Sequence, residues 1–148
     1  MAKEHNTATS STSPLQRCSL VSLPVVTHPG RGSLSIADNA AQLPLNVKRI
    51  FYIYDIPAGV ERGGHAHHSM NELIVAVTGC VDVEITDGTT EKTITLRHPS
   101  QALFLPAGIW RSLCRFSAGC VVLSLCDTDY NEADYIRDFN EYLQLKNT

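Results

Sequence analysis

Three histidines stand close together in the stretch Arg62-Gly63-Gly64-His65-Ala66-His67-His68. In an extended strand alternate side chains point to the same side, so His65 and His67 share one face and His68 lies on the other. Neighbouring glycines allow a ligand to approach the backbone. An imidazole titrates near neutral pH, which suits it to move protons or to bind a metal ion. A pair of surface histidines on an edge strand would give the same pattern, and the surrounding sequence distinguishes these interpretations.

The surrounding residues resemble the first sequence motif of the cupins. Gly59, His65, His67, Glu72 and Gly79 follow the pattern G-x5-H-x-H-x4-E-x6-G. In metal-binding cupins the two histidines and the glutamate are ligands on adjacent strands, an arrangement that suits Fe, Mn or Ni. A metal site is therefore one alternative for this stretch.

The second cupin motif, P-x-G-x2-H, is altered at its last position. The matching stretch is Pro106-Ala107-Gly108-Ile109-Trp110-Arg111, in which Arg111 replaces the histidine ligand. A guanidinium stays protonated and cannot coordinate a metal. Its positive charge also repels a metal ion nearby. We therefore expect no metal cofactor, and we expect Arg111 to approach Glu72.

Most of the chain consists of short runs of aliphatic and aromatic residues, broken by Gly, Pro, Asp and Asn. The clearest run, 80–86, alternates apolar with polar residues as a half-buried strand does, and Asp87-Gly88 favours a hairpin turn after it. Many short strands predict an all-β fold, here a double-stranded β-helix of the cupin or jelly-roll type. The candidate strands are 17–23, 33–37, 48–56, 72–78, 80–86, 91–96, 101–105, 109–116 and 119–126.

Only the C-terminal region has helical periodicity. Tyr135, Ile136, Phe139 and Leu143 recur at helical spacing within 130–144. We expect one short helix there, packed on the outside of the barrel.

Length and composition indicate a single globular domain over 15–148, preceded by a disordered tail over 1–14 that is rich in Ser, Thr and Ala. The formal charge of -3 among 148 residues favours neither nucleic acid nor a membrane surface as a partner. No apolar run reaches the roughly 20 residues that span a bilayer. Five cysteines without C-x-x-C spacing argue against a disulfide framework, and we expect a cytoplasmic protein.

Several stretches together resemble the sugar 3,4-ketoisomerases, which act on dTDP-4-keto-6-deoxyglucose. The resemblance runs from about residue 17 to 143. It rests on RGGHAHHSMNE (62–72), Arg31-Gly32-Ser33-Leu34, KRIFYIYD (48–55), FLPAGIW (104–110) and NEADYIRDFNEYL (131–143). It implies a metal-free isomerase that is a homodimer with exchanged strands, and a nucleotide-sugar substrate. Three positions depart from the family pattern: Gly64 replaces an aromatic residue, Glu72 a glutamine and Arg111 a histidine.

The resemblance implies that His65 and His67 transfer protons, and Tyr52 is a further catalytic candidate. A carbonyl at C4 of the sugar acidifies the hydrogen on C3, and an imidazole suits its removal because the pKa lies near working pH. The enediolate so formed needs a donor or a cation nearby. The candidates for binding the substrate are Arg49 and Arg62 for the diphosphate, together with Arg31, Glu72, Arg111 and Trp110.

Other interpretations of these residues stay open from the sequence. Tyr52 and Trp110 could be core residues, and the arginines could be solvated surface charges. The activity could also be that of a nucleotide-sugar 3,5-epimerase or of a metal-dependent cupin enzyme, or the chain could bind sugars without turnover.

Overall fold

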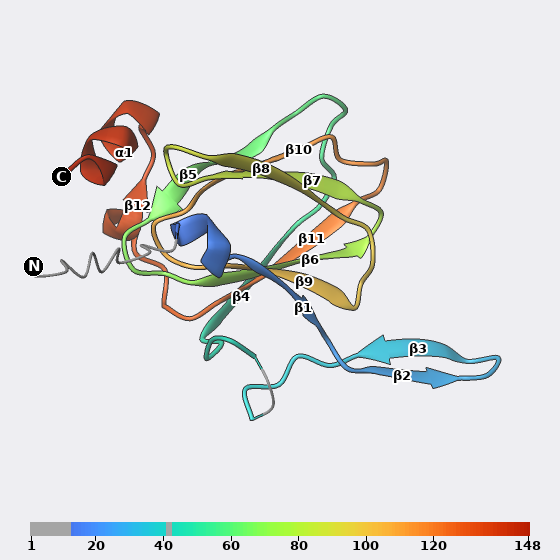
Figure 1. Cartoon of the computed structure of the whole chain (residues 1–148). Helices are drawn as coiled ribbons and strands as arrows, with labels where there is room; N and C mark the ends of the chain where they lie inside the picture. The colour runs from blue at the N-terminus through green and yellow to red at the C-terminus, as the bar shows by residue number, and fades with distance from the viewer. Residues whose placement is uncertain (1–12, 41–42) are drawn as a thin grey trace, which may run out of the picture.

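The computed structural model describes residues 13–40 and 43–148, which form two five-stranded antiparallel sheets that face each other (Figure 1). The first sheet has the order β1 (Ser19–Ser22), β9 (Gln101–Leu105), β6 (Glu72–Thr78), β11 (Val121–Cys126), β4 (Arg49–Ile53). The second has the order β12 (Tyr135–Ile136), β5 (Arg62–His67), β10 (Trp110–Cys114), β7 (Val81–Thr86), β8 (Glu91–Leu96). The predicted all-β jelly-roll fold is confirmed. The tail expected over 1–14 lies, up to residue 12, outside the described residues.

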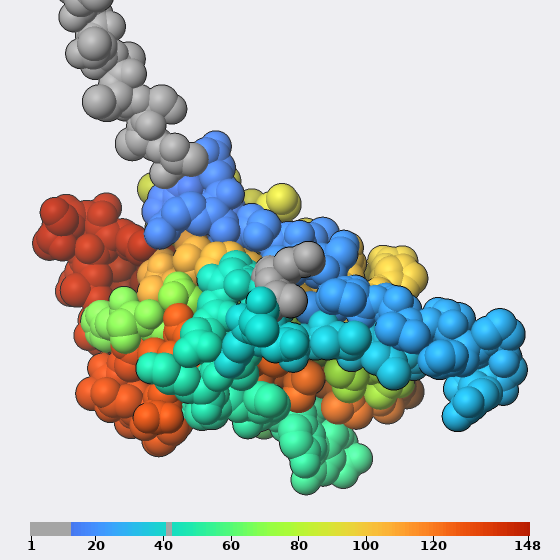
Figure 2. Space-filling view, turned by 90° about the horizontal axis from the view of Figure 1, so that it is seen from below, coloured from blue at the N-terminus to red at the C-terminus, as the bar shows by residue number. Residues whose placement is uncertain are grey.

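Each candidate strand corresponds to an observed one, with ends displaced by at most three residues. Sequence reasoning missed β2 (Val25–His28), which pairs with β3 (Gly32–Ser35) in a separate hairpin. Every residue of β2 and β3 is exposed. Figures 1 and 2 show that this hairpin projects from the barrel.

The prediction of one helix over 130–144 is wrong in its first half. A 3-10 turn, η2 (Glu132–Asp134), is followed by β12, and the helix α1 is limited to Phe139–Lys146. Tyr135 and Ile136 pair with the ends of β5 instead of continuing a helix, because the free edge of that strand supplies their hydrogen-bond partners. The helix begins at Asp138, whose side chain accepts a hydrogen bond from the backbone N–H of Glu141 at 2.8 Å. Among the described residues no helix is long and apolar enough to cross a membrane.

The two sheets enclose an apolar core from which polar side chains are excluded except at one end. The 3-10 turn η1 (Pro14–Arg17) covers part of it, and Leu15 and Cys18 pack against it. The core side chains include Ile74, Val83, Ile85, Leu96, Leu103, Leu105, Ile109 and Val122. Burial of this apolar surface is the main favourable term in folding.

The helix α1 is fastened to the second sheet through Tyr142, which is 1% exposed. Its hydroxyl lies 3.0 Å from the carbonyl oxygen of Thr86 and 2.8 Å from that of Gly108. The backbone N–H of Gly108 donates in turn to the carbonyl of His67 at 2.8 Å. The helix therefore supports the loop that holds the end of β5 in place.

We expect Tyr142→Phe to lower the free energy of unfolding by about 1–3 kcal/mol, because it leaves buried carbonyl oxygens without their donor. Urea denaturation followed by circular dichroism measures the change. Tyr130→Phe is the control, since that hydroxyl is exposed and its loss should change stability by less than about 0.5 kcal/mol. Equal stability of the two variants would contradict this account of how α1 is held.

Candidate active site

A cavity of about 360 Å³ lies between the two sheets, at the end where β5 and β12 meet. Both sheets contribute to its walls. The lining includes Phe51 and Ile53 of β4, Arg62 and His65 of β5, Glu72 of β6, Arg111 of β10, Ser124 of β11 and Tyr135 of β12. Polar and ionisable side chains therefore replace the apolar core at this end of the barrel.

A β-bulge before His65 explains the Gly63-Gly64 pair. Arg111 pairs with His65 whereas Ser112 pairs with Gly63, so Gly64 is an extra residue in β5. Both glycines have positive φ, and a Cβ on Gly63 would lie 3.0 Å from the backbone oxygen of Arg111. Only glycine fits this backbone without strain. The bulge allows Arg62 and His65 to line the same cavity.

The two histidines share a face of β5, as predicted, but differ in their access to the cavity. His65 is partly buried and lines it, whereas His67 is 1% exposed and does not. Their rings meet edge to face with centroids 4.9 Å apart. The ring of Tyr135 lies 5.0 Å from His65 and 4.3 Å from His67, and it lines the cavity. Tyr135 therefore contacts both imidazoles from the strand that borders β5.

Both imidazoles are neutral at neutral pH. Burial, followed by the positive charge of Arg111, lowers the pKa of His65 from 6.5 to about 4. Burial, Arg111 and His65 lower the pKa of His67 to about 3, while Asp134 acts in the opposite direction. A neutral imidazole has one nitrogen with a free lone pair, which is the form that accepts a proton.

Arg111 approaches Glu72, as the sequence predicted. The guanidinium is 1% exposed and its Nη2 lies 3.5 Å from Glu72 Oε2. Ser124 donates to the other carboxylate oxygen at 2.6 Å. None of the three guanidinium nitrogens has a hydrogen-bond partner in the described part of the chain. This buried cation has free donors directed at the site, and it is suited to an oxygen anion of a ligand.

The side chains at this position do not fit a metal ion. A fixed guanidinium would repel a metal held by His65 and Glu72. Within residues 13–40 and 43–148, no group of three His, Cys, Asp or Glu side chains is placed to hold one. The expectation of no metal cofactor stays a prediction.

Besides Arg111, two arginines line the cavity, and two of the arginines predicted from the sequence do not. Arg62 lines it, and so does Arg137, which pairs with Glu132 and lies 4.2 Å from the centroid of the Tyr135 ring. Arg49 does not line it and contacts the ring of Tyr130 at 5.4 Å. Arg31 is exposed in the turn that joins β2 and β3, away from the cavity of its own chain.

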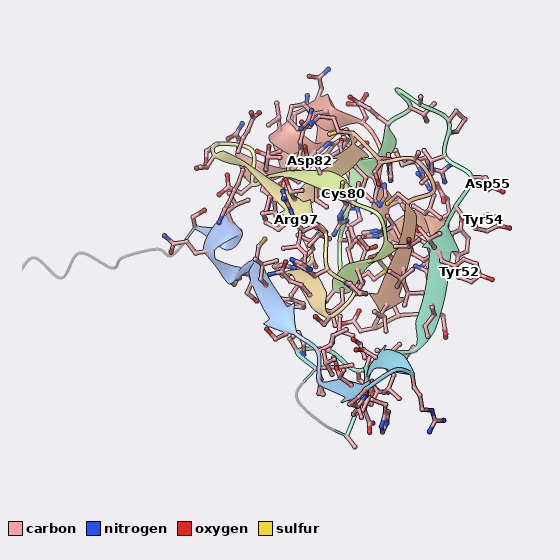
Figure 3. The ribbon with its side chains drawn as sticks, turned by 90° about the vertical axis from the view of Figure 1, so that its right-hand side faces the viewer. Tyr52, Tyr54, Asp55, Cys80, Asp82 and Arg97 are labelled. Atoms are coloured by element: carbon pink, nitrogen blue, oxygen red, sulfur yellow. The ribbon has the colours of Figure 1, made fainter. Side chains whose placement is uncertain are left out.

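Two aromatic candidates lie outside the cavity. Tyr52 is 62% exposed and points away from the barrel beside Tyr54, as Figure 3 shows. Trp110 packs against Phe139 and Tyr142 of α1, with ring centroids 5.0 Å and 5.4 Å away. The structure thus brings His65, Glu72, Arg111 and Arg62 to one cavity, and it leaves Tyr52, Trp110, Arg49 and Arg31 outside it.

Sequence reasoning missed several residues of the site. Tyr135 was assigned to a helix face, and Asp134 and Arg137 flank it in the same misread segment. Ser124 carried a usable signal, because it is a polar residue inside the apolar run 119–126. A polar side chain in the middle of a buried strand usually serves a partner.

Comparison with known proteins identifies a family for this chain. The family model FdtA, "WxcM-like, C-terminal", matches residues 16–147. The TDP-4-oxo-6-deoxy-alpha-D-glucose-3,4-oxoisomerase of Aneurinibacillus thermoaerophilus is 33% identical over 112 residues, which are 76% of this chain and 81% of that protein.

Two solved structures share both sequence and fold with this chain. A 3,4-ketoisomerase from Helicobacter canadensis is 33% identical, with a TM-score of 0.85 over 89% of this chain and 98% of the other. QdtA, a sugar 3,4-ketoisomerase from Thermoanaerobacterium thermosaccharolyticum solved with TDP, is 28% identical, with a TM-score of 0.86 over 90% and 96% of the two chains. The chain therefore belongs to the FdtA family, the WxcM-like group that includes the sugar 3,4-ketoisomerases.

Proposed function

We propose that this protein is a sugar-nucleotide 3,4-ketoisomerase that moves the keto group of a dTDP-linked 4-keto-6-deoxyhexose from C4 to C3. The observation that carries the proposal is a neutral imidazole, His65, facing a cavity that also holds the buried cation Arg111. The relatives support the substrate class, because one is named for a TDP-4-oxo-6-deoxyglucose and another was solved with TDP.

The reaction moves two protons and leaves the substrate's oxidation state unchanged. A base removes the hydrogen on C3, and the electron pair forms the C3–C4 double bond of an enediolate as the C4 oxygen takes the negative charge. That oxygen is then protonated, the proton on the C3 oxygen leaves, and C4 receives a proton. The products are a 3-keto group and a 4-hydroxyl group, so the chemistry needs proton carriers and an anion site, and no redox cofactor.

His65 is the group we assign to the carbon protons. Of the two histidines, His65 lines the cavity and His67 does not. The low pKa of His65 keeps its imidazole unprotonated and able to accept a proton. Arg111 is assigned to the developing negative charge on oxygen, because its unsatisfied donors are buried and it lines the cavity. His67 and Tyr135, which contact His65 from inside the barrel, are assigned to carrying the oxygen protons.

The substrate's charged end is assigned to the arginines at the edge of the cavity. Arg62 and Arg137 both line it and carry forked donors that suit a diphosphate. Arg49, Tyr52 and Trp110 stay candidates from the sequence that the cavity of one chain does not include.

We expect His65→Asn to reduce kcat by about 10²–10⁴-fold, the usual loss on removing a general base, with TDP binding nearly unchanged. His67→Asn should also reduce kcat by about 10²–10⁴-fold, because it removes the group assigned to the oxygen protons. Turnover in deuterated water should place deuterium at C4 of the product, because an imidazole exchanges its proton with solvent. Full activity of both variants would refute the assignment of the site, and an unlabelled C4 would refute an exchanging base.

The acidic limb of the pH profile should lie unusually low. The base must be neutral, so activity is lost as pH falls through its pKa, and kcat/KM should hold from pH 8 to about pH 5 and fall around pH 4. Arg111→Gln removes a positive charge that lowers this pKa, so the acidic limb of this variant should move to higher pH, although burial, the larger cause, remains. Circular dichroism at each pH provides the control for folding. A limb at 6.5 in the unaltered enzyme would contradict the site electrostatics.

We also propose that the protein is a homodimer with exchanged strands and that it works in the cytoplasm. The projecting hairpin exposes Val25, Val26 and Leu34, which are 39–49% exposed. A groove of about 570 Å³ lies beside it, and its walls include Val75, Val77 and Leu123 of the first sheet. Two copies related by a two-fold axis could bury both apolar surfaces at once. Exchange would also carry the turn with Arg31 away from its own barrel toward the partner.

We expect sedimentation to give about twice the 16.2 kDa of one chain, and Leu34→Glu to give the monomer, because it places a charge in the buried contact. Val60→Glu is the matched control, since Val60 is a similarly exposed apolar residue away from the hairpin. A monomeric unaltered protein at micromolar concentration would contradict the dimer.

A further inference from the structure

Asp134 is held rigidly at the end of η2, directly before Tyr135. One of its carboxylate oxygens accepts from the backbone N–H of Ser69 at 2.9 Å and from its hydroxyl at 2.6 Å. The other accepts from the backbone N–H of Met70 at 3.1 Å. Three donors to one carboxylate favour its ionised form and leave it little freedom to rotate.

The same carboxylate meets the buried histidine. Asp134 Oδ2 lies 3.3 Å from Nδ1 of His67, and this nitrogen has no hydrogen-bond partner within the described ranges. The two residues are fixed relative to each other by the backbone, because His68 N–H donates to the Asp134 carbonyl at 2.9 Å and Tyr135 pairs with His67. A small rotation of the imidazole would align a hydrogen bond from Nδ1 to Oδ2.

The charge of Asp134 decides where the single proton of a neutral imidazole resides. An ionised carboxylate only accepts hydrogen bonds, so it favours the proton on Nδ1. Nε2 then keeps its lone pair on the far side of the ring. The rings of His65 and Tyr135 pack against His67, with centroids 4.9 Å and 4.3 Å away, so His67 is part of the cluster that borders the cavity.

We propose that Asp134 is a positioning residue of the isomerase, which fixes His67 in the tautomer protonated on Nδ1 and so keeps Nε2 as a proton acceptor. The role of Asp134 in turnover rests on the proposed function. Its effect on the tautomer of His67 rests only on the contact between the two side chains. Asp134 does not line the cavity, and it acts on the substrate only through His67.

The test is Asp134→Asn in the full chain, with two independent readouts. An amide at this position can present an N–H to Nδ1, which favours the opposite tautomer, protonated on Nε2. The ¹⁵N shifts of labelled histidine at pH 7 report the tautomer directly, and His67→Asn identifies the signals. We expect Nδ1–H in the unaltered protein, Nε2–H in the variant, and a kcat lower by about 10²–10⁴-fold with little change in KM, the scale of loss typical when a general acid or base is disabled.

Asp127→Asn is the matched control. Asp127 supports the same loop in the same way, accepting from the backbone N–H of Asn71 at 2.9 Å and from its side-chain amide at 2.7 Å. In the described part of the chain it makes no hydrogen bond or ion pair with His67. Loss of loop support alone should therefore appear in both variants, whereas the change of tautomer and the loss of kcat should appear only in Asp134→Asn.

Two results would overturn the proposal. The first is His67 protonated on Nε2 in the unaltered protein. This measurement requires neither a folded variant nor turnover of a substrate. The second is a switched tautomer in Asp134→Asn with kcat unchanged. An unaltered protein that does not isomerise the sugar would instead refute the proposed function, and the tautomer measurement would still decide the role of Asp134 toward His67.

Discussion

The guanidinium of Arg111 is buried between the two sheets, and the arrangement of the cavity depends on it. A buried cation is costly unless an anion and hydrogen-bond acceptors surround it. Glu72 supplies the charge at 3.5 Å, with Ser124 holding its other oxygen, but the guanidinium nitrogens have no hydrogen bonds among the described residues. Such a pair contributes little to stability. Its arrangement is better explained by a substrate oxygen that completes it.

The same cation determines the state of the histidines. It lies on the strand paired with His65, and its charge adds to burial in keeping both imidazoles unprotonated. In the folded protein these histidines stay neutral below pH 6.5, where the unfolded chain would protonate them, so folding stability falls as pH decreases from about 6.5 toward 4. The same burial and charge that keep the imidazoles of His65 and His67 unprotonated at neutral pH therefore lower the folding stability in acid.

Much of this site could be predicted from the sequence, for physical reasons that particular residues show. The H-x-H pattern lies on a strand, whose period of two places both rings on one face. The two cupin motifs predicted the approach of Glu72 and Arg111, which lie on β6 and β10 in the two different sheets and meet between them. Alternation of apolar and polar residues predicted a strand over 80–86, and β7 covers this run except for residue 80.

What the sequence could not supply was tertiary pairing at the free edge of β5. Tyr135 and Ile136 have helical spacing with Phe139, but pairing with His67 and Ala66 outweighs that weak local preference. The outward position of Tyr52 in β4 was not predictable for a related reason: Phe51 and Ile53 are the inward residues of this strand, and alternation alone does not say which set faces in.

The histidines are equivalent in the sequence and become different through what packs behind each of them. His65 lies next to the bulge and opens onto the cavity, whereas His67 lies deeper in the strand, against the segment that carries Asp134 and Tyr135. One ring can therefore contact a sugar, while the other is held by a carboxylate and reaches the substrate only through its neighbours. These two environments suit a reaction that moves one proton between carbons and another between oxygens. The segment made of η2 and β12 supplies the second one, because it brings the carboxylate of Asp134 and the phenol of Tyr135 to His67.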